Sequence, residues 1–358
     1  MRHLACILAT LGGIITWATA QDTLLLFHPT AYNLDVIETL VKEGMLDLEG
    51  YHVLGVYHID ERYPYDSTRV RIGRMDPPRY SLCEITDSLG PGDLFGANCC
   101  SGEFSRLFNS SRGALFMGGP DIPPSAYGEP VHLLTRVTDP GRHYMELSYL
   151  FHLLGGYQDT GWSPYMNRDE NYLISGICLG MQTINVAAGG TLIQDIPSEV
   201  YHTWIAEELL SMPADNVHRN YADMVNPGCD PPTSYHFHRI RPVNGSLLTR
   251  VMEAGDGTSP LVLSSHHQSV EKMGKGLMVS ATSMDGKIIE ALEHERYPHV
   301  LGVQFHPEKP GLFVPGIVHP LRCGDSIDFS EVISGTASFS FHQSYWKNIG
   351  ETLQSNKR

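Results

Sequence analysis

A cysteine with Gly176 two residues before it and Gly180 two residues after it joins an apolar stretch to a helix-like one. Residues 172–177 are typical of a buried strand, and residues 179–188 of a helix. We expect Cys178 on the sharp turn between them, where side chains at either glycine would collide with neighbouring backbone. The free N–H groups and positive dipole of the helix end favour a thiolate there. The pattern predicts a nucleophile.

A histidine and a glutamate, His306 and Glu308, stand two residues apart in the segment GVQFHPE, at the end of another apolar run. In an extended chain both side chains face the same way, and Pro307 favours extended backbone at the histidine. One strand end can therefore present an imidazole base together with a carboxylate that orients it. With Cys178, this predicts a Cys-His-Glu triad.

A third segment, FMGGPD (116–121), ends a short apolar run at two glycines and a proline. Glycines leave backbone N–H groups accessible, so the amides of Gly119 and Leu179 are candidates for binding a tetrahedral oxyanion. Each such donor contributes about 2.7–4 kcal/mol in known enzymes.

These segments together resemble the class I glutamine amidotransferase superfamily, and within it peptidase family C26, the gamma-glutamyl-gamma-aminobutyrate hydrolase branch. The resemblance extends over residues 110–310 and includes GGPDIPPSAYGE, SSHHQSV and SMDGKIIEALEH. It implies a flavodoxin-like three-layer α/β sandwich, with a mostly parallel central sheet and an added antiparallel strand region. It also implies roles: Cys178 as nucleophile, His306 as general base and acid, Glu308 as its orienter, and Gln182, His266 and Gln268 as substrate contacts.

The chain departs from that branch at one position next to the nucleophile. The branch usually has arginine there, whereas this chain has Leu179, as amidotransferases and folate-type gamma-glutamyl hydrolases do. The first strand region, residues 60–112 and the tail beyond 310 do not match closely. Those regions would shape the leaving-group pocket, so the resemblance does not identify the substrate.

The remaining chain predicts the elements that position these residues. Residues 23–58 give strand, helix and strand, the start of a parallel α/β sheet. Residues 60–112, rich in Pro, Gly and Ser, predict an excursion or small subdomain. Further strands and helices are predicted at 113–120, 141–156, 260–265, 277–283, 287–294 and 299–306, with a variable tail over 311–358 that ends in a helix at 339–354. On the helix at 141–156, Arg142 and Glu146 have the spacing of an i, i+4 pair.

The first twenty residues have an early Arg2, an apolar stretch and small residues at Ala18 and Ala20. This predicts a signal peptide over 1–20, cleaved after Ala20, and a secreted or periplasmic domain over 21–358; a buried first element is the alternative. No other segment has the apolar length of a membrane anchor. The net charge of −15 disfavours a nucleic-acid partner, and a homodimer stays open.

Cysteine and histidine usage gives two further expectations. Either Cys99 or Cys100 is expected to pair with Cys83, and Cys229 with Cys323, in an oxidising compartment. Two pairs of histidines, His236 with His238 and His266 with His267, resemble a metal set. Eighteen histidines produce such pairs by chance, and a metal would compete for the thiolate, so we expect no metal and no cofactor.

Three functions remain open. The first is an exported cysteine hydrolase that cleaves gamma-glutamyl amide bonds of small molecules through a thioester on Cys178. The second is a glutaminase subunit that forms the same thioester and passes ammonia to a partner synthase. The third is a non-catalytic binding protein on the same scaffold.

Overall fold

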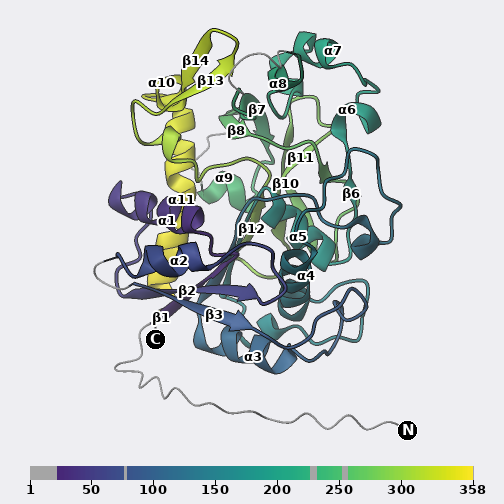
Figure 1. Ribbon diagram of the computed structural model, residues 1–358, viewed down its shortest axis with the longest axis vertical. Helices are drawn as coiled ribbons and strands as arrows, with labels where there is room; N and C mark the ends of the chain where they lie inside the picture. Colours follow the sequence, from purple (N-terminus) through teal and green to yellow (C-terminus); the bar gives the residue numbers. More distant parts are fainter. Residues whose placement is uncertain (1–21, 76–78, 226–231, 252–256, 358) are drawn as a thin grey trace.

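The computed structural model describes residues 22–75, 79–225, 232–251 and 257–357, drawn as ribbon in Figure 1. A ten-stranded sheet runs through them in the order β3-β2-β1-β4-β5-β12-β11-β10-β7-β8. The strands from β3 to β12 are parallel: β1 (Asp22–Phe27), β2 (Tyr51–His58), β3 (Tyr80–Ile85), β4 (Gly113–Phe116), β5 (Leu173–Ile177) and β12 (Val300–Val303). The rest are antiparallel: β7 (His236–Pro242), β8 (Leu261–Ser264), β10 (Leu277–Ser283) and β11 (Ile289–His294).

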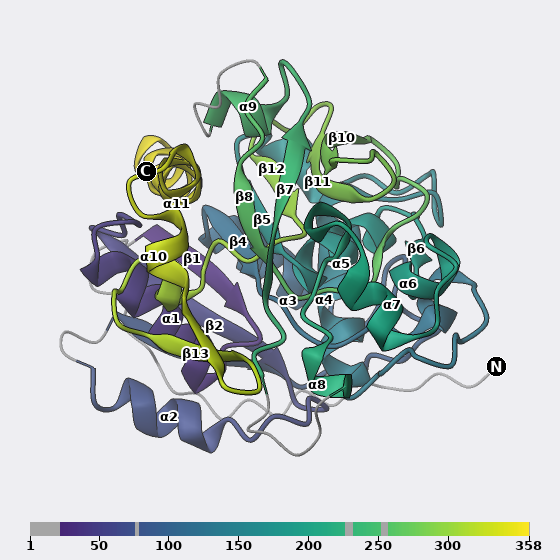
Figure 2. The same cartoon turned by 90° about the horizontal axis from the view of Figure 1, so that it is seen from above.

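Helices cover both faces of this sheet, as the view in Figure 2 shows. One face carries α3 (Ser101–Ser110), α4 (Pro140–Leu154) and α5 (Leu179–Ala187). The other carries α1 (Ala31–Lys42), α2 (Asp66–Ile72), α9 (Leu247–Val251), α10 (Phe329–Ile333) and α11 (Ala337–Ser355). A separate apolar core fills the space on each side of the sheet. The predicted three-layer α/β sandwich, mostly parallel with an added antiparallel region, is confirmed.

Smaller elements lie outside these layers. They are the helices α6 (Ile196–Glu199), α7 (Ala206–Ser211) and α8 (Ala222–Val225), the 3-10 turns η1 (Pro124–Tyr127), η2 (Tyr165–Arg168), η3 (Ala214–Asn216) and η4 (Pro310–Leu312), and two strand pairs, β6 (Leu192–Ile193) with β9 (Ser269–Val270) and β13 (Val318–Arg322) with β14 (Asp325–Asp328).

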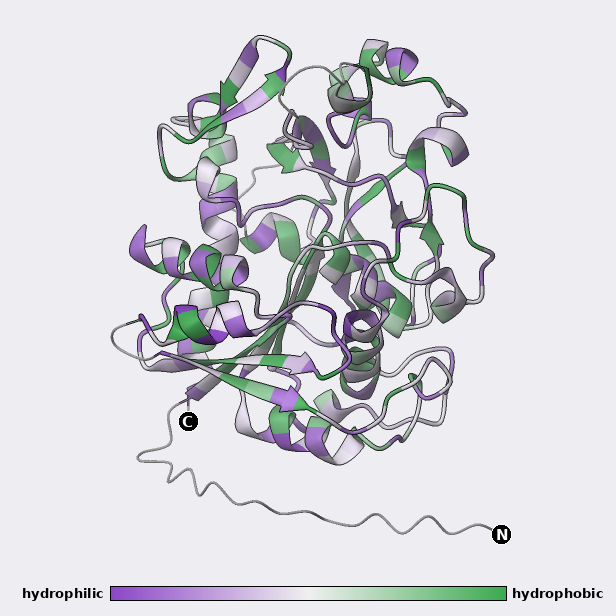
Figure 3. Ribbon diagram, viewed as in Figure 1, coloured by the Kyte–Doolittle hydropathy of each residue, from purple (hydrophilic) through white to green (hydrophobic). Residues whose placement is uncertain are grey.

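Hydropathy explains the central position of the parallel strands. Figure 3 shows apolar residues concentrated on them, and every residue of β5 is buried. Parallel strands that are covered on both faces have continuous apolar sequences instead of alternating ones. The facing helices have local start signals as well. In α4, the Asp139 side chain accepts a hydrogen bond from the Arg142 N–H, Pro140 occupies the first turn, and Gly155 ends the helix at φ 69°.

Two regions differ in detail from the sequence-based expectations. Residues 60–112 contribute α2, the edge strand β3 and α3 to the main fold. The strand β3 pairs in parallel with β2, and most of its residues are partly exposed, which makes its pattern weak in sequence. In the tail, β13 and β14 form a hairpin, and α11 buries Tyr345 and Trp346 against the sheet.

The predicted disulfide of Cys83 is wrong, because Cys83, Cys99 and Cys100 are all free. The Sγ of Cys83 lies 3.6 Å from Glu103 of α3, whereas the Sγ of Cys100 lies 3.4 Å from the carbonyl of Asp87. Cys323 is disulfide-bonded; its expected partner, Cys229, lies outside the described residues.

The predicted signal peptide, residues 1–20, also lies outside the described residues. Among the helices that the structure describes, none has the length and apolar character needed to cross a bilayer.

Candidate active site

Cys178 occupies the turn between the end of β5 and the start of α5, with φ 53° and ψ −105°. Positive φ is costly for a residue with a side chain, and such strain persists where the surrounding structure enforces it. Both flanking glycines are required by close packing. A Cβ on Gly176 would lie 2.5 Å from the carbonyl carbon of Gly180, and one on Gly180 would overlap the carbonyl oxygen of Phe116. The chain therefore closes tightly behind the thiol and leaves the sulfur at the carboxyl end of the sheet.

His306 follows β12, the strand that pairs with β5 in parallel, with Val303 opposite Ile177. The N–H of Cys178 donates to the carbonyl of Val303 at 2.8 Å, which joins the two segments at their functional ends. A Cβ on Gly118 would lie 2.9 Å from Cε1 of His306 and 3.6 Å from Cβ of Cys178, so both side chains approach the same point.

The imidazole of His306 is paired with a carboxylate. Its Nδ1 donates to Oε1 of Glu308 at 2.7 Å, and both side chains are buried. Burial by itself lowers the pKa of His306, but Glu308, Tyr235 and Cys178 raise it well above its usual value. Burial likewise opposes ionisation of Glu308, yet His306 and Lys309 hold the pKa of that carboxyl down to about 2. The pairing therefore favours an imidazolium and a carboxylate in this position.

The two residues that carry the candidate oxyanion donors lie close together. Leu179 begins α5, so its N–H has no acceptor within the helix. A Cβ on Gly119 would lie 2.8 Å from Cδ2 of Leu179 and 3.0 Å from Cζ of Arg142, so a side chain at this position would have to displace both of these side chains. The loop is held by Arg142, whose Nη2 donates to the carbonyls of Met117 at 2.7 Å and Gly118 at 3.2 Å.

The expected pairing on α4 is present. Nε of Arg142 donates to Oε1 of Glu146 at 2.7 Å, with both side chains almost completely buried. This ion pair thus links α4 to the backbone of the glycine loop.

A cavity of about 310 Å³ opens in front of these groups. Its wall contains the thiol, the imidazole and the glycine loop, together with one lysine and two tyrosines. The lining residues are Tyr32, Asn33, Met117, Gly118, Gly119, Cys178, Tyr235, Ser265, His306, Glu308 and Lys309.

Known proteins are similar to this chain over the segment that contains Cys178, His306 and Glu308. The family model described as Peptidase C26 matches residues 102–308, more than half of the chain. The chain belongs to the peptidase C26 family.

Relatives of this C26 protein include amidotransferase-like proteins. A candidate glutamine amidotransferase of Mycobacterium tuberculosis is 34% identical over 57% of this chain and 52% of its own length. A glutamine amidotransferase-like protein of Rickettsia prowazekii is 33% identical over 39% of this chain and 54% of its own. The chain thus spans about half the length of these curated relatives. A solved glutamine amidotransferase from Methylobacillus flagellatus aligns over 94% of this chain and 96% of its own, at 12% identity and a TM-score of 0.42.

Three residues predicted as substrate contacts are buried and are not among the lining residues given above for the cavity. Gln182 donates to Oε1 of Gln304 at 3.2 Å and to the carbonyl of Gln268 at 3.3 Å. The side chain of Gln268 donates to the carbonyl of Gln194 at 3.1 Å. His266 is buried, and its Nδ1 donates to the carbonyl of Gln268 at 2.9 Å. Their role as substrate contacts stays a prediction.

Three residues near the thiol were not predicted. Nε2 of Gln304 lies 3.7 Å from the sulfur, and Gln304 has the same two-residue spacing from His306 that Glu308 has. Lys309 directly follows GVQFHPE, and its Nζ lies 3.3 Å from Glu308 and over the ring of Tyr235. The ring of Tyr235 meets that of His306 edge-on, with centroids 5.2 Å apart. The positions of Gln304 and Lys309 next to His306 and Glu308 in the sequence could have indicated these two residues. No sequence pattern points to Tyr235.

Proposed function

We propose that this C26 protein is a cysteine hydrolase that cleaves gamma-glutamyl amide bonds. The observation that carries the proposal is the strained turn at Cys178, faced by a buried ion pair of His306 and Glu308. Nucleophile, base and orienting carboxylate are what covalent acyl transfer requires. The family and the named relatives support a hydrolase or amidotransferase type of chemistry.

The proposed reaction has two halves. The thiolate of Cys178 attacks the gamma-carbonyl carbon, and the amides of Gly119 and Leu179 bind the oxygen that becomes negative. His306 gives its proton to the departing amine, which leaves glutamate bound as a thioester. His306 then takes a proton from water, the resulting hydroxide attacks the thioester, and glutamate leaves as the thiolate is restored.

Charge in the cavity supports an acidic substrate. Lys309 lines it, and a neighbouring carboxylate raises the pKa of this lysine, so the ammonium is retained. We assign the lysine to the alpha-carboxylate of the glutamyl group, because Lys309 and Cys178 line the same cavity.

A glutaminase that supplies ammonia to a synthase is the second candidate, favoured by the names of the relatives. Both candidate enzymes form the same thioester. They differ in whether turnover requires a partner synthase. Hydrolysis of gamma-glutamyl conjugates by the isolated protein supports the first. Glutamine turnover that begins only with an added partner supports the second.

The test of the chemistry is labelling by a gamma-glutamyl chloroketone, followed by peptide mass mapping. We expect modification of Cys178, and a steep loss of labelling in His306→Asn. Cys99, which is free and exposed, provides the matched control: Cys99→Ser should label and hydrolyse like the wild type. If Cys178→Ala hydrolysed gamma-glutamyl conjugates at the wild-type rate, the proposal would be contradicted. If neither the wild type nor Cys178→Ala hydrolysed them, a binding role would be favoured.

We further propose that the chain is exported by residues 1–20 and functions without a nucleic-acid partner or a membrane anchor. The order of charge, apolar stretch and small residues supports export, and the net charge of −15 disfavours a nucleic-acid partner. Terminal sequencing of protein expressed with the complete sequence should find Gln21 first in the exported fraction. A cell-retained chain that still begins at Met1 would refute export.

A further inference from the structure

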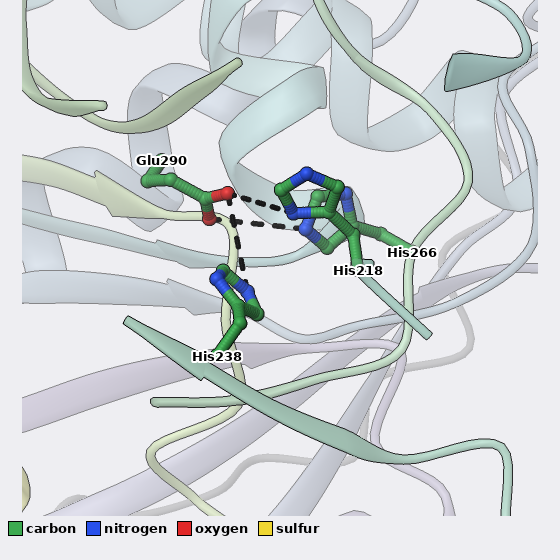
Figure 4. A group of neighbouring side chains, drawn as sticks. All are labelled: His218, His238, His266 and Glu290. Carbon is green, nitrogen blue, oxygen red and sulfur yellow. Dashed lines mark ion pairs between the residues drawn. The ribbon is translucent and has the colours of Figure 1, made fainter. Parts of the chain in front are cut away.

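A second group of chemically active side chains lies apart from the residues that line the cavity. His218, His238, His266 and Glu290 converge from the segment before α8, from β7, from the loop after β8 and from β11. We call these four residues the histidine–glutamate cluster. Figure 4 shows the three imidazoles directed at the carboxylate of Glu290.

Each member of the cluster is at most 4% exposed. One ligand atom from each lies within 4.8 Å of the others. From Glu290, Oε1 is 3.1 Å from Nδ1 of His218 and 3.9 Å from Nε2 of His238, and Oε2 is 3.8 Å from Nε2 of His266. Four ligands at about 2.0–2.1 Å from a tetrahedral Zn²⁺ lie about 3.3 Å apart. Binding would therefore require the longer separations in the cluster to shorten by up to about 1.5 Å.

Main-chain carbonyls fix which nitrogen of two imidazoles faces the centre. Nδ1 of His266 donates to the carbonyl of Gln268 at 2.9 Å, and Nδ1 of His238 to that of Arg239 at 3.2 Å. Each Nε2 therefore carries a lone pair directed inward. A carbonyl that accepts from the outer nitrogen is the usual support for a metal-bound histidine.

Several polar atoms of the cluster make no hydrogen bond of good geometry with the described residues. Neither nitrogen of His218, neither oxygen of Glu290, nor Nε2 of His266 has a hydrogen-bond partner among the described residues. Within that same part of the chain, the ion-pair partners of Glu290 are the three imidazoles alone. Buried nitrogen and oxygen atoms without hydrogen-bond partners are costly, and a bound cation would satisfy them together.

We propose that the histidine–glutamate cluster binds one Zn²⁺ as a structural site. Imidazole and carboxylate suit zinc, and four protein ligands without an open position are typical of structural zinc. The metal would displace the hydrogen bond that Nε2 of His238 accepts from Ser264 at 2.8 Å.

This proposal revises the expectation of no metal, and it uses a different set of residues from the two histidine pairs. His236 is held at the carbonyl of Ala214, and His267 lies between Asp121 and Asp195, so neither joins the cluster. The concern that a metal competes for the thiolate does not apply, because Cys178 contributes no ligand to the cluster.

The site has a structural consequence for the cavity. The N–H of His266 donates to the carbonyl of His218 at 3.0 Å, and the neighbouring Ser265 lines the cavity. Zinc would join the two segments that carry His218 and His266 to β7 and β11, and so stabilise the part of the cavity wall that contains Ser265.

The experiment uses the full chain without a histidine tag, in a Cys178→Ser background that removes the thiolate as a competing ligand. Protein expressed with ZnCl₂ and purified without chelator is assayed for metal by mass spectrometry. We expect about one zinc per chain. After chelator treatment, zinc alone should raise the melting temperature by about 5 °C.

Glu290→Gln keeps the shape and removes the charged ligand, and we expect its zinc content and its zinc-induced shift to fall at least fivefold. His236→Asn, on the same strand as His238, should keep both. X-ray absorption at the zinc edge on the unaltered chain needs no variant, and should show nitrogen and oxygen neighbours at about 2.0–2.1 Å without sulfur. Metal-free protein after expression with zinc, or zinc bound equally by Glu290→Gln, would overturn the proposal.

Discussion

Nδ1 of His306 lies 2.7 Å from Oε1 of Glu308, with both groups buried beside the sulfur of Cys178. Two residues of one strand end thus form an ion pair without help from another segment. The proposed chemistry depends on this pair, because the carboxylate selects the ring nitrogen that faces the thiol.

Glu308→Gln tests the pair through activity. The amide keeps the shape but loses the charge that stabilises the imidazolium, so we expect kcat to fall by about 10³-fold or more. Steady-state hydrolysis of gamma-glutamyl-p-nitroanilide measures it. Glu331→Gln, which changes an exposed glutamate in α10, is the control and should retain activity. Equal rates in both variants would contradict the role of Glu308.

The same substitution has a pH signature in stability. The pKa of Glu308 is lowered to about 2 in the folded protein, so the ionised carboxylate stabilises the fold above about pH 4.5. This contribution is lost as the pH falls towards 2. The raised pKa of His306 stabilises it below about pH 6.5, and that contribution is lost as pH rises through the folded-state value. The wild type should therefore exceed Glu308→Gln by about 2 kcal/mol between pH 4.5 and 6.5, and by less on either side. Urea unfolding across this range measures the difference; a flat profile would contradict the pairing.

The glycines around the nucleophile predict a steric effect. Gly180→Ala places a methyl group against the carbonyl of Phe116, so we expect a loss of about 1–3 kcal/mol and little labelling of Cys178. Gly102→Ala in α3 is the matched control, because a Cβ there has no neighbour within 4 Å. It should be neutral or slightly stabilising. Thermal unfolding and chloroketone labelling give the comparison, and equal losses in the two variants would reject the steric explanation.

The buried ion pair of Arg142 and Glu146 predicts that substitutions of these two residues have non-additive effects on the free energy of unfolding. Arg142→Met leaves a buried carboxylate and two carbonyls unpaired, at a cost of about 3–5 kcal/mol. Adding Glu146→Leu should recover much of the loss, because no buried charge then remains. The exposed pair of Arg322 and Asp325 is the control, and Arg322→Met should change stability by less than about 1 kcal/mol. Additive losses in the double variant, measured by urea unfolding, would contradict the coupling.

The proposed role of Lys309 predicts that its replacement raises KM only for substrates that carry the alpha-carboxylate. If its ammonium binds the alpha-carboxylate, Lys309→Met should raise KM for gamma-glutamyl substrates by about 10–100-fold. A substrate with that carboxylate converted to an amide should show no comparable change, and Lys309→Arg should preserve most of the affinity. Equal losses with both substrates would assign Lys309 to support of Glu308 instead.

Local patterns were sufficient for the fold class and for assembling the candidate triad. The segments around Cys178, His306 and Gly119 each end an apolar strand, and parallel strands bring their carboxyl ends to one edge. Such a prediction needs only the order of apolar runs and the turn residues.

Other features required three-dimensional information. The strand β3 has mixed exposure, so its apolar signal is diluted. The histidine–glutamate cluster joins four segments, and its members His218 and Glu290 have no motif that links them. The sulfur atoms of Cys83 and Cys100 face Glu103 and Asp87 respectively, and spacing along the chain contains no information about that.

The parallel pairing of β5 with β12 fixes the spacing between thiol and imidazole through backbone hydrogen bonds. Insertions or deletions in the long connection between these strands can therefore alter the cavity walls while the reacting atoms keep their separation. Substrate preference and bond-cleaving chemistry are thereby free to diverge independently, and related chains with different connections should act on different amides by the same route.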